Sequence, residues 1–394
     1  MKNIKKDVLK YVLGTYIRKD IAFVSGKGSR LKTIDGKTVL DFFPGWGVSN
    51  LGHCHKNIVK AIRDQAKKII HLANIFYIPD QADVAKGIIK KSFPGQVFFS
   101  NSGTEAVECA IKTAKAWGKP QGKLEFISLN RSFHGRTIGS VTLTGQETYR
   151  SAFGSLMPNV KYADLNDIKS VENLISRKTC AIIIELVQGE GGVRIATKSF
   201  VKKLENISRK HKILLIFDEV QTGFGRTSKF FAYQNYGVKP HIMCLGKAIA
   251  GGVAMGATVI AKDITSIMKP GMHASTFGGN YLACAAAKAV LRTFEEDNIL
   301  QNMKVVQKEL KLFFTKLSKK YAQITSFRSL GMMYGLEMKD DFASKIADQA
   351  LENGLIINCT AKNVLRIMPA LNLSLKDCRK GMKIIEKVFS HVCR

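Results

Sequence analysis

The sequence predicts an α/β protein, in which helices cover both faces of a mainly parallel central sheet and a smaller α+β domain lies beside it. Apolar runs of strand length alternate with amphipathic helical patterns between residues 97 and 217, which is typical of crossover units on parallel strands. From residue 299 onward the pattern changes to helix, strands, helix, strand, strand, helix. We therefore expect residues 46–298 to form a large domain, residues 299–394 a C-terminal small domain, and residues 1–45 an N-terminal segment that belongs to the small domain.

The N-terminal region favours a helix followed by short strands near residues 22–24, 29–31 and 39–42. A glycine-rich stretch then leads into an amphipathic helix, which we expect at about residues 56–70. His53 and His55 could form a metal-binding pair, but the sequence places no third ligand nearby. Roles in the loop or in packing are therefore favoured for both histidines, and we expect no metal.

A possible anion site follows the next strand, at residues 97–99. Ser102, Gly103 and Thr104 come directly after this strand, and a helix with an apolar stripe begins there. The free backbone N–H groups and the dipole of a helix N-terminus attract anions, so a phosphate could bind at this turn. The same residues could instead serve only as the N-cap of the helix, with Glu105 as the partner of the cap.

The other expected elements follow in order along the chain. In the large domain, strands are expected at 124–129, 180–186, 213–217, 242–245 and 256–261, with helices at 167–176, 199–211 and 281–296. In the small domain, helices are expected at 299–321, 342–353 and 375–392, with strands within 324–338, at 355–358 and at 364–368.

Two of these strands end in residues that can carry chemistry. The run at 213–217 stops at Asp218, and the run at 242–245 is followed after one glycine by Lys247. Ligands of open parallel sheets bind beyond the carboxyl ends of the strands, so the acid and the lysine could meet at one site. Separately, Asp218 could cap a turn and Lys247 could be a solvated loop residue. Together they indicate a lysine that forms a Schiff base and a carboxylate that holds a pyridinium nitrogen, which is the chemistry of pyridoxal phosphate.

The composition is typical of a soluble globular protein. Of the 394 residues, 45% are hydrophobic and 23% are charged, and no apolar segment approaches the roughly 20 residues of a membrane helix. The net charge of +30 comes from lysines spread along the whole chain rather than from a basic block interleaved with aromatics, so specific nucleic-acid binding is not expected. The chain starts without the pattern of a secretory signal, and its eight cysteines contain no CxxC pair, which favours a cytoplasmic protein with reduced thiols.

Motifs along nearly the whole chain resemble those of the class III aminotransferases of pyridoxal-phosphate fold type I. They are, in order, GSRLKTIDGKTVLDF, LGHCH, FFSNSGTEAVECAIK, FHGRT, QGEGGV, DEVQTGFGRT, FAYQNYGV, STFGGN and LRIMPAL. The resemblance implies the fold type I architecture, pyridoxal 5'-phosphate as the cofactor, and a homodimer whose active sites lie at the subunit interface.

The resemblance also implies roles for individual residues. Lys247 would form the Schiff base with the cofactor, and Asp218 would pair with the pyridine nitrogen. Arg136 would bind a substrate carboxylate, and Arg366 would bind the α-carboxylate of glutamate or 2-oxoglutarate. Glu190 would act as a switch that leaves Arg366 when glutamate binds. The remaining implied residues are Ser102, Gly103 and Thr104 at the phosphate, Phe133 on the cofactor ring, Gln221 at the phenolic oxygen, Thr276 from the second subunit, and Ser275 at the substrate.

Within the family, the motifs are most similar to those of enzymes that act on N2-acetyl-L-ornithine. The implied reaction transfers the amino group of this donor to 2-oxoglutarate by ping-pong kinetics, giving N-acetyl-L-glutamate 5-semialdehyde and L-glutamate in arginine biosynthesis. Ornithine, succinylornithine, lysine-pathway and 4-aminobutyrate aminotransferases are the alternatives, and a basic nucleic-acid-binding protein on the same fold is a more remote one. Among the positions that depart from the family pattern, Trp46 lies in a loop that helps to shape the substrate mouth.

Overall fold

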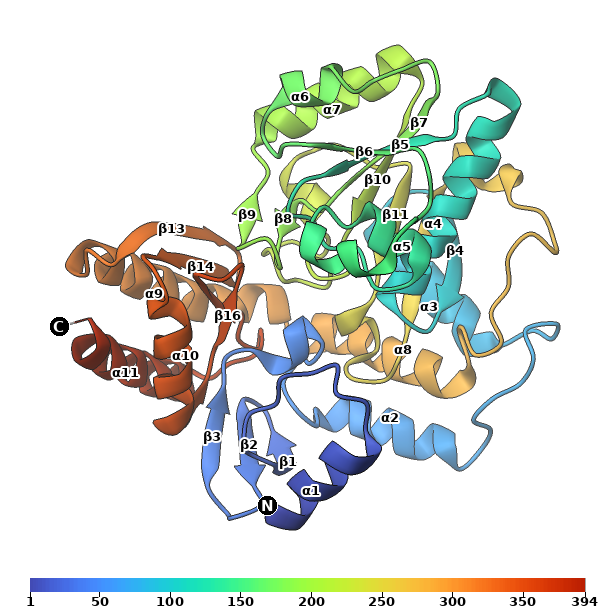
Figure 1. Ribbon diagram of the computed structural model, residues 1–394. Helices are drawn as coiled ribbons and strands as arrows, with labels where there is room; N and C mark the ends of the chain where they lie inside the picture. The colour runs from blue at the N-terminus through green and yellow to red at the C-terminus, as the bar shows by residue number, and fades with distance from the viewer. Residues whose placement is uncertain (394) are drawn as a thin grey trace.

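A seven-stranded sheet forms the centre of the computed structural model, which describes residues 1–393 and confirms the predicted α/β fold (Figure 1). Every pair of neighbouring strands in this sheet is parallel except the two pairs that involve β12, which runs antiparallel to both its neighbours. In spatial order the strands are β4 (Gly95–Ser100), β12 (Gly256–Ala261), β11 (Ile242–Leu245), β10 (Leu214–Asp218), β7 (Thr179–Ile184), β5 (Glu125–Leu129) and β6 (Val160–Ala163).

Helices cover both faces of this sheet because its strands are apolar on both sides. Ile183 and Ile216 share a core cluster with the apolar residues of α4, whereas Ile182 and Leu215 share another with those of α7. Neighbouring residues of a strand point to opposite faces, so a continuous apolar run is what a doubly covered strand requires. The helices of this part of the chain are α3 (Pro79–Lys91), α4 (Gly103–Gly118), α5 (Ile138–Leu143), α6 (Ile168–Glu172), α7 (Lys198–His211) and α8 (Tyr281–Glu296).

Three adjacent strands bring polar residues to one edge of the sheet. Strands β11, β10 and β7 are neighbours and parallel, so their carboxyl ends lie together. Asp218 is the last residue of β10, Glu185 follows β7 directly, and Lys247 follows β11 after one glycine. Both carboxylate residues are buried, with exposed fractions of 4% and 6%. The topology therefore gathers two acids and one lysine at the place where ligands bind in open parallel sheets.

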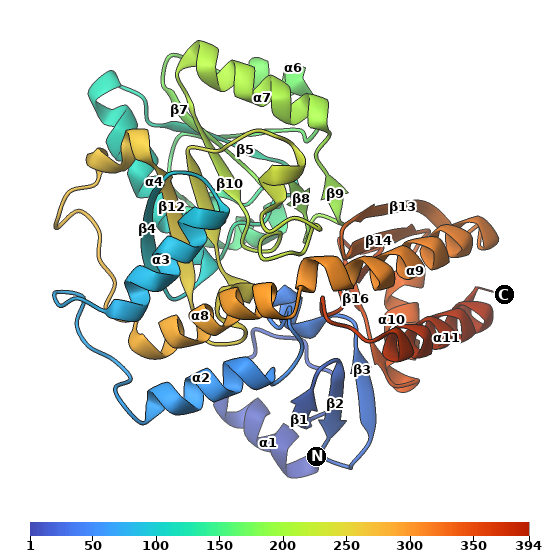
Figure 2. The ribbon, with the colours of Figure 1, turned by 180° about the vertical axis from the view of Figure 1, so that it is seen from behind.

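Two smaller four-stranded sheets lie beside the large one, formed by the two ends of the chain (Figure 2). One contains β1 (Phe23–Lys27), β2 (Arg30–Thr33), β3 (Thr38–Asp41) and β15 (Leu355–Ile356), in that order. The other contains β13 (Ile324–Leu330), β14 (Met333–Met338), β17 (Val364–Ile367) and β16 (Asn358–Thr360). The helices at the two ends are α1 (Lys2–Tyr11), α2 (Lys56–Ala66), α9 (Ile299–Lys320), α10 (Phe342–Glu352) and α11 (Leu375–Val392), and β8 (Val187–Gln188) pairs with β9 (Arg194–Ile195) in a separate ribbon.

The strand predicted at residues 355–358 is wrong in one respect. It is divided at Ile357: β15 pairs in parallel with β3 of the N-terminal sheet, and β16 pairs with β17 of the other sheet. The chain thus changes sheets within a few residues, which a hydrophobic pattern cannot reveal because both pieces are half-buried strands. The N-terminal and C-terminal segments consequently share one sheet.

Other differences concern helix ends and elements that the sequence did not indicate. Helix α2 ends at Ala66 instead of near residue 70, and residues 67–70 are exposed, so no buried face extends the helix. Helix α3 and strand β6 were not predicted.

His53 Nε2 lies 2.8 Å from Asp41 Oδ2, and residues 1–393 contain no cluster of three side chains that could hold a metal. Over the same residues, no helix has the length and apolar character to span a membrane.

Candidate active site

Asp218 and His134 form the innermost polar pair of the site. His134 Nδ1 lies 2.7 Å from Asp218 Oδ2, and the other carboxylate oxygen accepts the backbone N–H of Val220 at 3.0 Å. Both Asp218 and His134 are buried, and His134 Nε2 has no partner among the described residues. Asp218 therefore does cap a turn, as its simplest interpretation predicts, but one of its oxygens also faces a buried imidazole.

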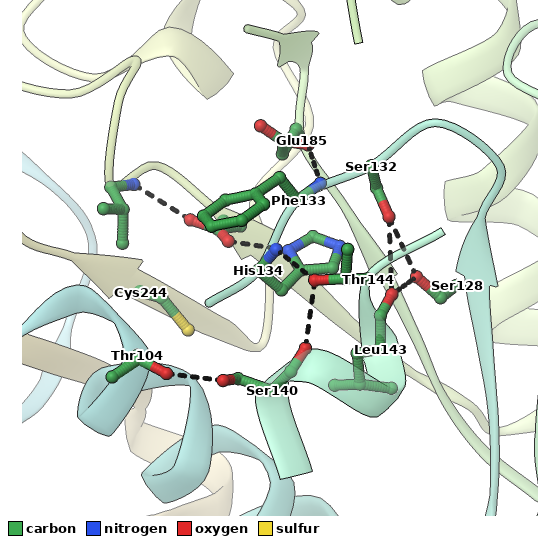
Figure 3. A network of polar contacts seen from close by, with 12 residues as sticks. Thr104, Ser128, Ser132, Phe133, His134, Ser140, Leu143, Thr144, Glu185 and Cys244 are labelled. Atoms are coloured by element: carbon green, nitrogen blue, oxygen red, sulfur yellow. Dashed lines mark hydrogen bonds and ion pairs between the residues drawn. The ribbon is translucent and has the colours of Figure 1, made fainter. Parts of the chain in front are cut away.

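A second buried acid, Glu185, lies against the loop that carries Phe133 and His134 (Figure 3). Its Oε2 accepts the backbone N–H of Phe133 at 2.9 Å. Burial raises the pKa of Glu185 well above its ordinary value, and the charge of Asp218 raises it further. His134 is fixed from the other side, because its backbone N–H donates to Thr144 Oγ1 at 2.9 Å. Phe133 is thus held by its backbone, and its ring packs edge to face with Tyr149.

Lys247 has an unusual backbone conformation for a residue with a side chain. Its φ is 44°, in the left-handed region, where it begins a short 3-10 helix (Lys247–Ala250) directly beyond β11. Such conformations are concentrated at functional sites, where the surrounding structure maintains them. Burial lowers the pKa of the Lys247 amine, and the nearby carboxylates of Glu190, Asp218 and Glu185 oppose this effect only in part. A lysine with a lowered pKa is a better nucleophile near neutral pH.

The N-terminus of α4 lies against the turn that carries Lys247. A Cβ added to Gly246 would come within 3.1 Å of Gly103 Cα and N, so the two turns touch through their glycines. Within residues 1–393 the backbone N–H groups of Gly103 and Thr104 have no hydrogen-bond acceptor, as expected for the first turn of a helix. This turn can therefore bind an anion next to Lys247.

The hydroxyl groups at this helix end are already engaged within the protein. Ser102 Oγ accepts the backbone N–H of Glu105 at 3.3 Å and donates to its carboxylate at 2.8 Å, as an N-cap does. Thr104 Oγ1 lies 2.5 Å from Ser140 Oγ and accepts the backbone N–H of Arg136 at 3.2 Å. Of the groups expected at a phosphate, the backbone N–H groups are thus free to bind it, whereas the Ser102 hydroxyl caps α4 and the Thr104 hydroxyl holds the loop of Arg136.

Gln221 presents an unpaired oxygen to the same region. Its Nε2 donates to the carbonyl oxygen of Trp46 at 3.2 Å, while its buried Oε1 has no partner among the described residues. A Cβ added to Gly189 would lie only 1.6 Å from this Oε1, so the glycine makes room for the amide. Trp46 itself is 51% exposed, with φ 56°.

The buried Arg366 and the partly buried Glu190 form an ion pair at the rim of the site. Arg366 is completely buried in β17, and its Nη1 donates to Glu190 Oε1 at 2.7 Å. Burial alone would raise the pKa of Glu190, but the charge and hydrogen bond of Arg366 outweigh burial and lower it. A Cβ added to Gly189 would lie 3.4 Å from Arg366 Nη1 and 1.6 Å from Gln221 Oε1, and one added to Gly246 would lie 3.3 Å from Val220 Cγ1, so the ion pair and Lys247 flank the turn that follows Asp218. The structure therefore brings together Lys247, Asp218, Glu190 and Arg366.

The remaining predicted residues lie further out. Arg136 is exposed, with its guanidinium 4.1 Å from the ring centroid of Tyr149 and 5.5 Å from that of Phe133. Ser275 Oγ accepts from Asn101 Nδ2 at 3.2 Å, beside the N-terminus of α4. Thr276 is exposed.

Some residues of the site were not predicted from the sequence. His134 lies within the quoted motif FHGRT, but the motif gave no reason to pair it with Asp218. Glu185 ends an apolar strand in the same way as Asp218, and this parallel could have indicated it. Asn358, Thr360 and Phe43, which contact Arg366 or Glu190, had no distinguishing pattern.

Comparison with known proteins gives long and consistent matches. A profile of the family described as Aminotransferase class-III matches residues 16–389. The acetylornithine aminotransferase of Caldanaerobacter subterraneus is 43% identical over 386 residues, which are 97% of this chain and 98% of the relative. That of Methanocaldococcus jannaschii is 41% identical over 391 residues, covering 97% of each chain.

Solved structures agree with the sequence matches. The N-acetylornithine aminotransferase of Stenotrophomonas maltophilia matches with a TM-score of 0.85 and 29% identity over 98% of both chains. The ornithine aminotransferase of Toxoplasma gondii matches with a TM-score of 0.94 and 28% identity, over 99% of this chain and 95% of its own. In another crystal structure of the Toxoplasma enzyme, pyridoxal phosphate partially occupies the active site.

Fold and site together are those of a pyridoxal-phosphate-dependent transaminase. Since the family profile covers nearly all of its length, the chain belongs to the class III aminotransferase family. The residues present fit the cofactor that this family implies: a lysine with a lowered pKa, a buried aspartate, unpaired N–H groups at a helix N-terminus and an unpaired amide oxygen at Gln221 surround one region.

Proposed function

We propose that this protein is a cytoplasmic homodimeric aminotransferase that moves the amino group of N2-acetyl-L-ornithine to 2-oxoglutarate, as in arginine biosynthesis. The products are N-acetyl-L-glutamate 5-semialdehyde and L-glutamate. The identity of 38–43% to acetylornithine aminotransferases over nearly the full length supports this choice of donor. Free ornithine is the second candidate, because ornithine aminotransferases are among the solved structures that match the fold.

The observation that carries the proposal is the ion pair of the buried Arg366 and the partly buried Glu190, which flanks the same turn as Lys247. A transaminase of this kind must accept two different amines in turn. In N2-acetyl-L-ornithine the transferred amino group is far from the α-carboxylate, whereas in L-glutamate it is on the carbon that carries the α-carboxylate. When Glu190 covers Arg366, the site next to Lys247 is closed to a carboxylate. When Glu190 leaves, Arg366 can bind the α-carboxylate of glutamate in a bidentate geometry.

The residues at the strand ends divide the remaining work. Bound pyridoxal phosphate supplies a carbonyl that condenses with amines and a ring that accepts the electron pair released at the substrate carbon. Lys247 Nζ would hold the cofactor and, when free, would move the proton of the substrate carbon. Asp218, fixed by His134 and by the N–H of Val220, would pair with the pyridine nitrogen. The first turn of α4 would bind the phosphate through its N–H groups.

Substrate carboxylates meet two arginines in different surroundings. Arg366 is buried and takes the α-carboxylate of glutamate or 2-oxoglutarate. The exposed Arg136 takes the second carboxylate of these two dicarboxylates, at the other end of the molecule. Arg136 is held in place by the rings of Tyr149 and Phe133, so its guanidinium is oriented before the substrate arrives. Ser275 contributes from the loop beside Asn101.

A second subunit completes the site in this proposal. Exposed large apolar side chains gather in two stretches of this chain, which is unusual for a monomer. They include Leu9, Tyr11, Leu13, Tyr16 and Ile17 near the N-terminus, and Ile75, Phe76 and Tyr77 before α3. Thr276, which is also exposed, binds the phosphate of the neighbouring subunit.

The test is an absorbance titration of the purified protein loaded with pyridoxal phosphate. N2-acetyl-L-ornithine, L-ornithine, N2-succinyl-L-ornithine, 4-aminobutyrate and L-glutamate are added separately, and the conversion of the bound cofactor to its aminated form is followed. We expect N2-acetylornithine and glutamate to convert it rapidly and free ornithine to do so weakly. A wide preference for free ornithine or 4-aminobutyrate would show that the donor is wrong.

A further inference from the structure

Arg366 is held on three sides by groups of different character. Its Nη1 donates to Glu190, and the ring of Phe43 lies 4.7 Å from the guanidinium carbon. On the third side, Asn358 Oδ1 accepts from Nε at 3.1 Å and from Nη2 at 2.8 Å. The guanidinium thus has two oxygen partners, of which only Glu190 is charged.

The two oxygen partners also differ in how firmly the backbone holds them. Asn358 lies on β16 directly opposite Arg366 on β17, so the register of an antiparallel pair fixes their distance. Glu190 lies in a glycine-rich turn between β8 and β9, and Gly192 in that turn has a φ of 97°. Thr360 Oγ1 donates to the carbonyl oxygen of Glu190 at 2.9 Å and reaches its Oε2 only at 3.4 Å, so Thr360 anchors the backbone of the acid, while its carboxylate has only this long contact with Thr360 to give up when it turns away.

We propose that Asn358 determines the response of the site to dicarboxylates, because it orients Arg366 through two hydrogen bonds without neutralising its charge. Glu190 is then the only carboxylate that an incoming glutamate or 2-oxoglutarate must replace. This inference rests on the proposed function, since it explains how the glutamate-binding arginine of that site stays receptive. Asn358 is a positioning residue that acts through Arg366.

A carboxylate at position 358 would change the electrostatics but almost nothing else. Aspartate has the size and shape of asparagine and can accept the same two hydrogen bonds. It would give Arg366 a counter-charge that cannot move, since β16 fixes it opposite the arginine. A substrate carboxylate would then approach an arginine that is already neutralised, even after Glu190 has turned away.

The experiment compares the two half-reactions of the cofactor-loaded dimer in Asn358→Asp and in the native protein. For glutamate, we expect kcat/KM of the half-reaction to fall about 10- to 100-fold, because the α-carboxylate loses most of its attraction to Arg366. For N2-acetylornithine, we expect a change of less than about threefold, because Glu190 covers Arg366 while this donor reacts. Asn206→Asp, an exposed position on α7, introduces the same charge elsewhere and should alter neither half-reaction.

A second pair of variants separates the position of the charge from the number of charges. Glu190→Gln combined with Asn358→Asp has the native net charge, yet its counter-charge is fixed. We expect this double variant to remain at least about tenfold less efficient with glutamate than Glu190→Gln alone. Recovery of the double variant to the level of Glu190→Gln would overturn the proposal.

Binding of glutarate, a dicarboxylate without an amino group, provides a measurement that does not depend on turnover. Calorimetry should show a larger loss of glutarate affinity in Asn358→Asp than in Asn358→Ala, which removes both hydrogen bonds but adds no charge. Equal losses would show that Asn358 only orients Arg366. If Asn358→Asp does not fold, the alanine variant decides alone: a glutarate affinity below native supports the proposal, because Arg366 is no longer oriented, and an affinity equal to or above native overturns it.

The outcomes distinguish this inference from the proposed function. A native protein that ignores glutamate overturns both. A native protein that reacts with glutamate and N2-acetylornithine, while Asn358→Asp reacts equally well with both, overturns the inference alone.

Discussion

Two arginines, Arg226 and Arg366, are completely buried, and their surroundings differ in kind. Arg226 Nη1 donates to the carbonyl oxygens of Pro369 at 2.6 Å and Met332 at 3.2 Å, and its Nη2 donates to Asn50 Oδ1. All three acceptors are neutral. Arg366, in contrast, has a carboxylate partner as well as an amide.

This difference indicates which buried arginine can exchange partners. The acceptors around Arg226 come from three segments far apart in the sequence, so they cannot leave without separating those segments. Burial without a counter-charge lowers the pKa of Arg226 to about 9, which reflects how unfavourable the cation is there. Glu190, on its glycine-rich turn, can be replaced by another carboxylate. A buried arginine with a removable acid marks a binding site, whereas one enclosed by backbone oxygens marks a structural junction.

The largest expected effect follows removal of the exchangeable arginine. Arg366→Leu should lower kcat/KM of the glutamate half-reaction about 10³-fold, because the α-carboxylate loses its charged partner in a buried site. The half-reaction with N2-acetylornithine should fall far less. Single-turnover absorbance measurements with each amine check this, and an equal fall in both half-reactions would contradict the contrast between the two arginines.

The corresponding change at the structural junction should affect stability instead. Arg226→Met should lower the free energy of unfolding by about 3 kcal/mol, because three buried oxygens lose their donors. Urea denaturation of the native and variant proteins measures this loss. The ratio of the two half-reactions should stay at the native value, and a changed ratio with unchanged stability would assign Arg226 to the site.

Two acids, Glu219 without a cation and Glu190 beside Arg366, should differ in how their contributions to stability change with pH. Glu219 is completely buried and accepts the backbone N–H groups of Ala232 and Tyr233 at 2.5 and 2.8 Å, without a cation. Burial raises its pKa from 4.5 to about 7. Between pH 4.5 and about 7, Glu219 therefore keeps its proton in the folded state and loses it in the unfolded state. The contribution of Glu219 to the free energy of unfolding falls as pH rises through this range, by up to about 3 kcal/mol.

The measurement is urea denaturation from pH 5 to pH 8, with Glu219→Gln as the variant. The difference in unfolding free energy, native protein minus variant, should fall as pH rises from 5 to about 7 and then level off. Glu190 contributes with the opposite sign and below this pH range, because Arg366 lowers its pKa from 4.5, so its contribution is lost only as pH falls below that value. A difference that does not vary with pH would mean that Glu219 is ionised throughout.

The smallest expected effect concerns the aromatic side of the exchangeable arginine. Phe43→Leu should weaken glutarate binding about three- to tenfold, because the ring that covers Arg366 contributes a cation–π interaction in a desolvated place. Calorimetric titration measures the affinity. Tyr149→Leu, which removes a ring from the exposed Arg136, should have a smaller effect, because solvent weakens the same interaction there.

The fold and the centre of the site were within reach of the sequence because they depend on local patterns. The apolar runs that end at Asp218 and before Lys247 specify both the strands and the residues at their ends, and the topology of parallel strands brings those ends together. Arg366 and Glu190 were indicated only by the family resemblance. Their hydrogen bond depends on how the small sheet packs against the loop of Glu190, which no local pattern encodes.

The contacts around Arg366 could not be predicted from the sequence for a related reason. Asn358 lies opposite Arg366 only because the chain leaves one sheet at Ile356 and enters another at Asn358. The expected strand at 355–358 spans that change, so its register against β17 could not be assigned. His134 likewise meets Asp218 through a loop whose path is set by Glu185 and Thr144.

The sharing of one sheet by the two ends of the chain has a consequence for synthesis in the cell. Strand β3 ends at Asp41, and β15, which completes its sheet, begins at Leu355, more than 300 residues later. At the usual rate of about 5 to 20 residues per second, the ribosome needs roughly 15 to 60 s to cover that distance. During this time the edge of β3 is unpaired and open to other strands. The nascent chain therefore passes through a long interval in which its own sequence supplies no strand to cover this edge of the N-terminal sheet.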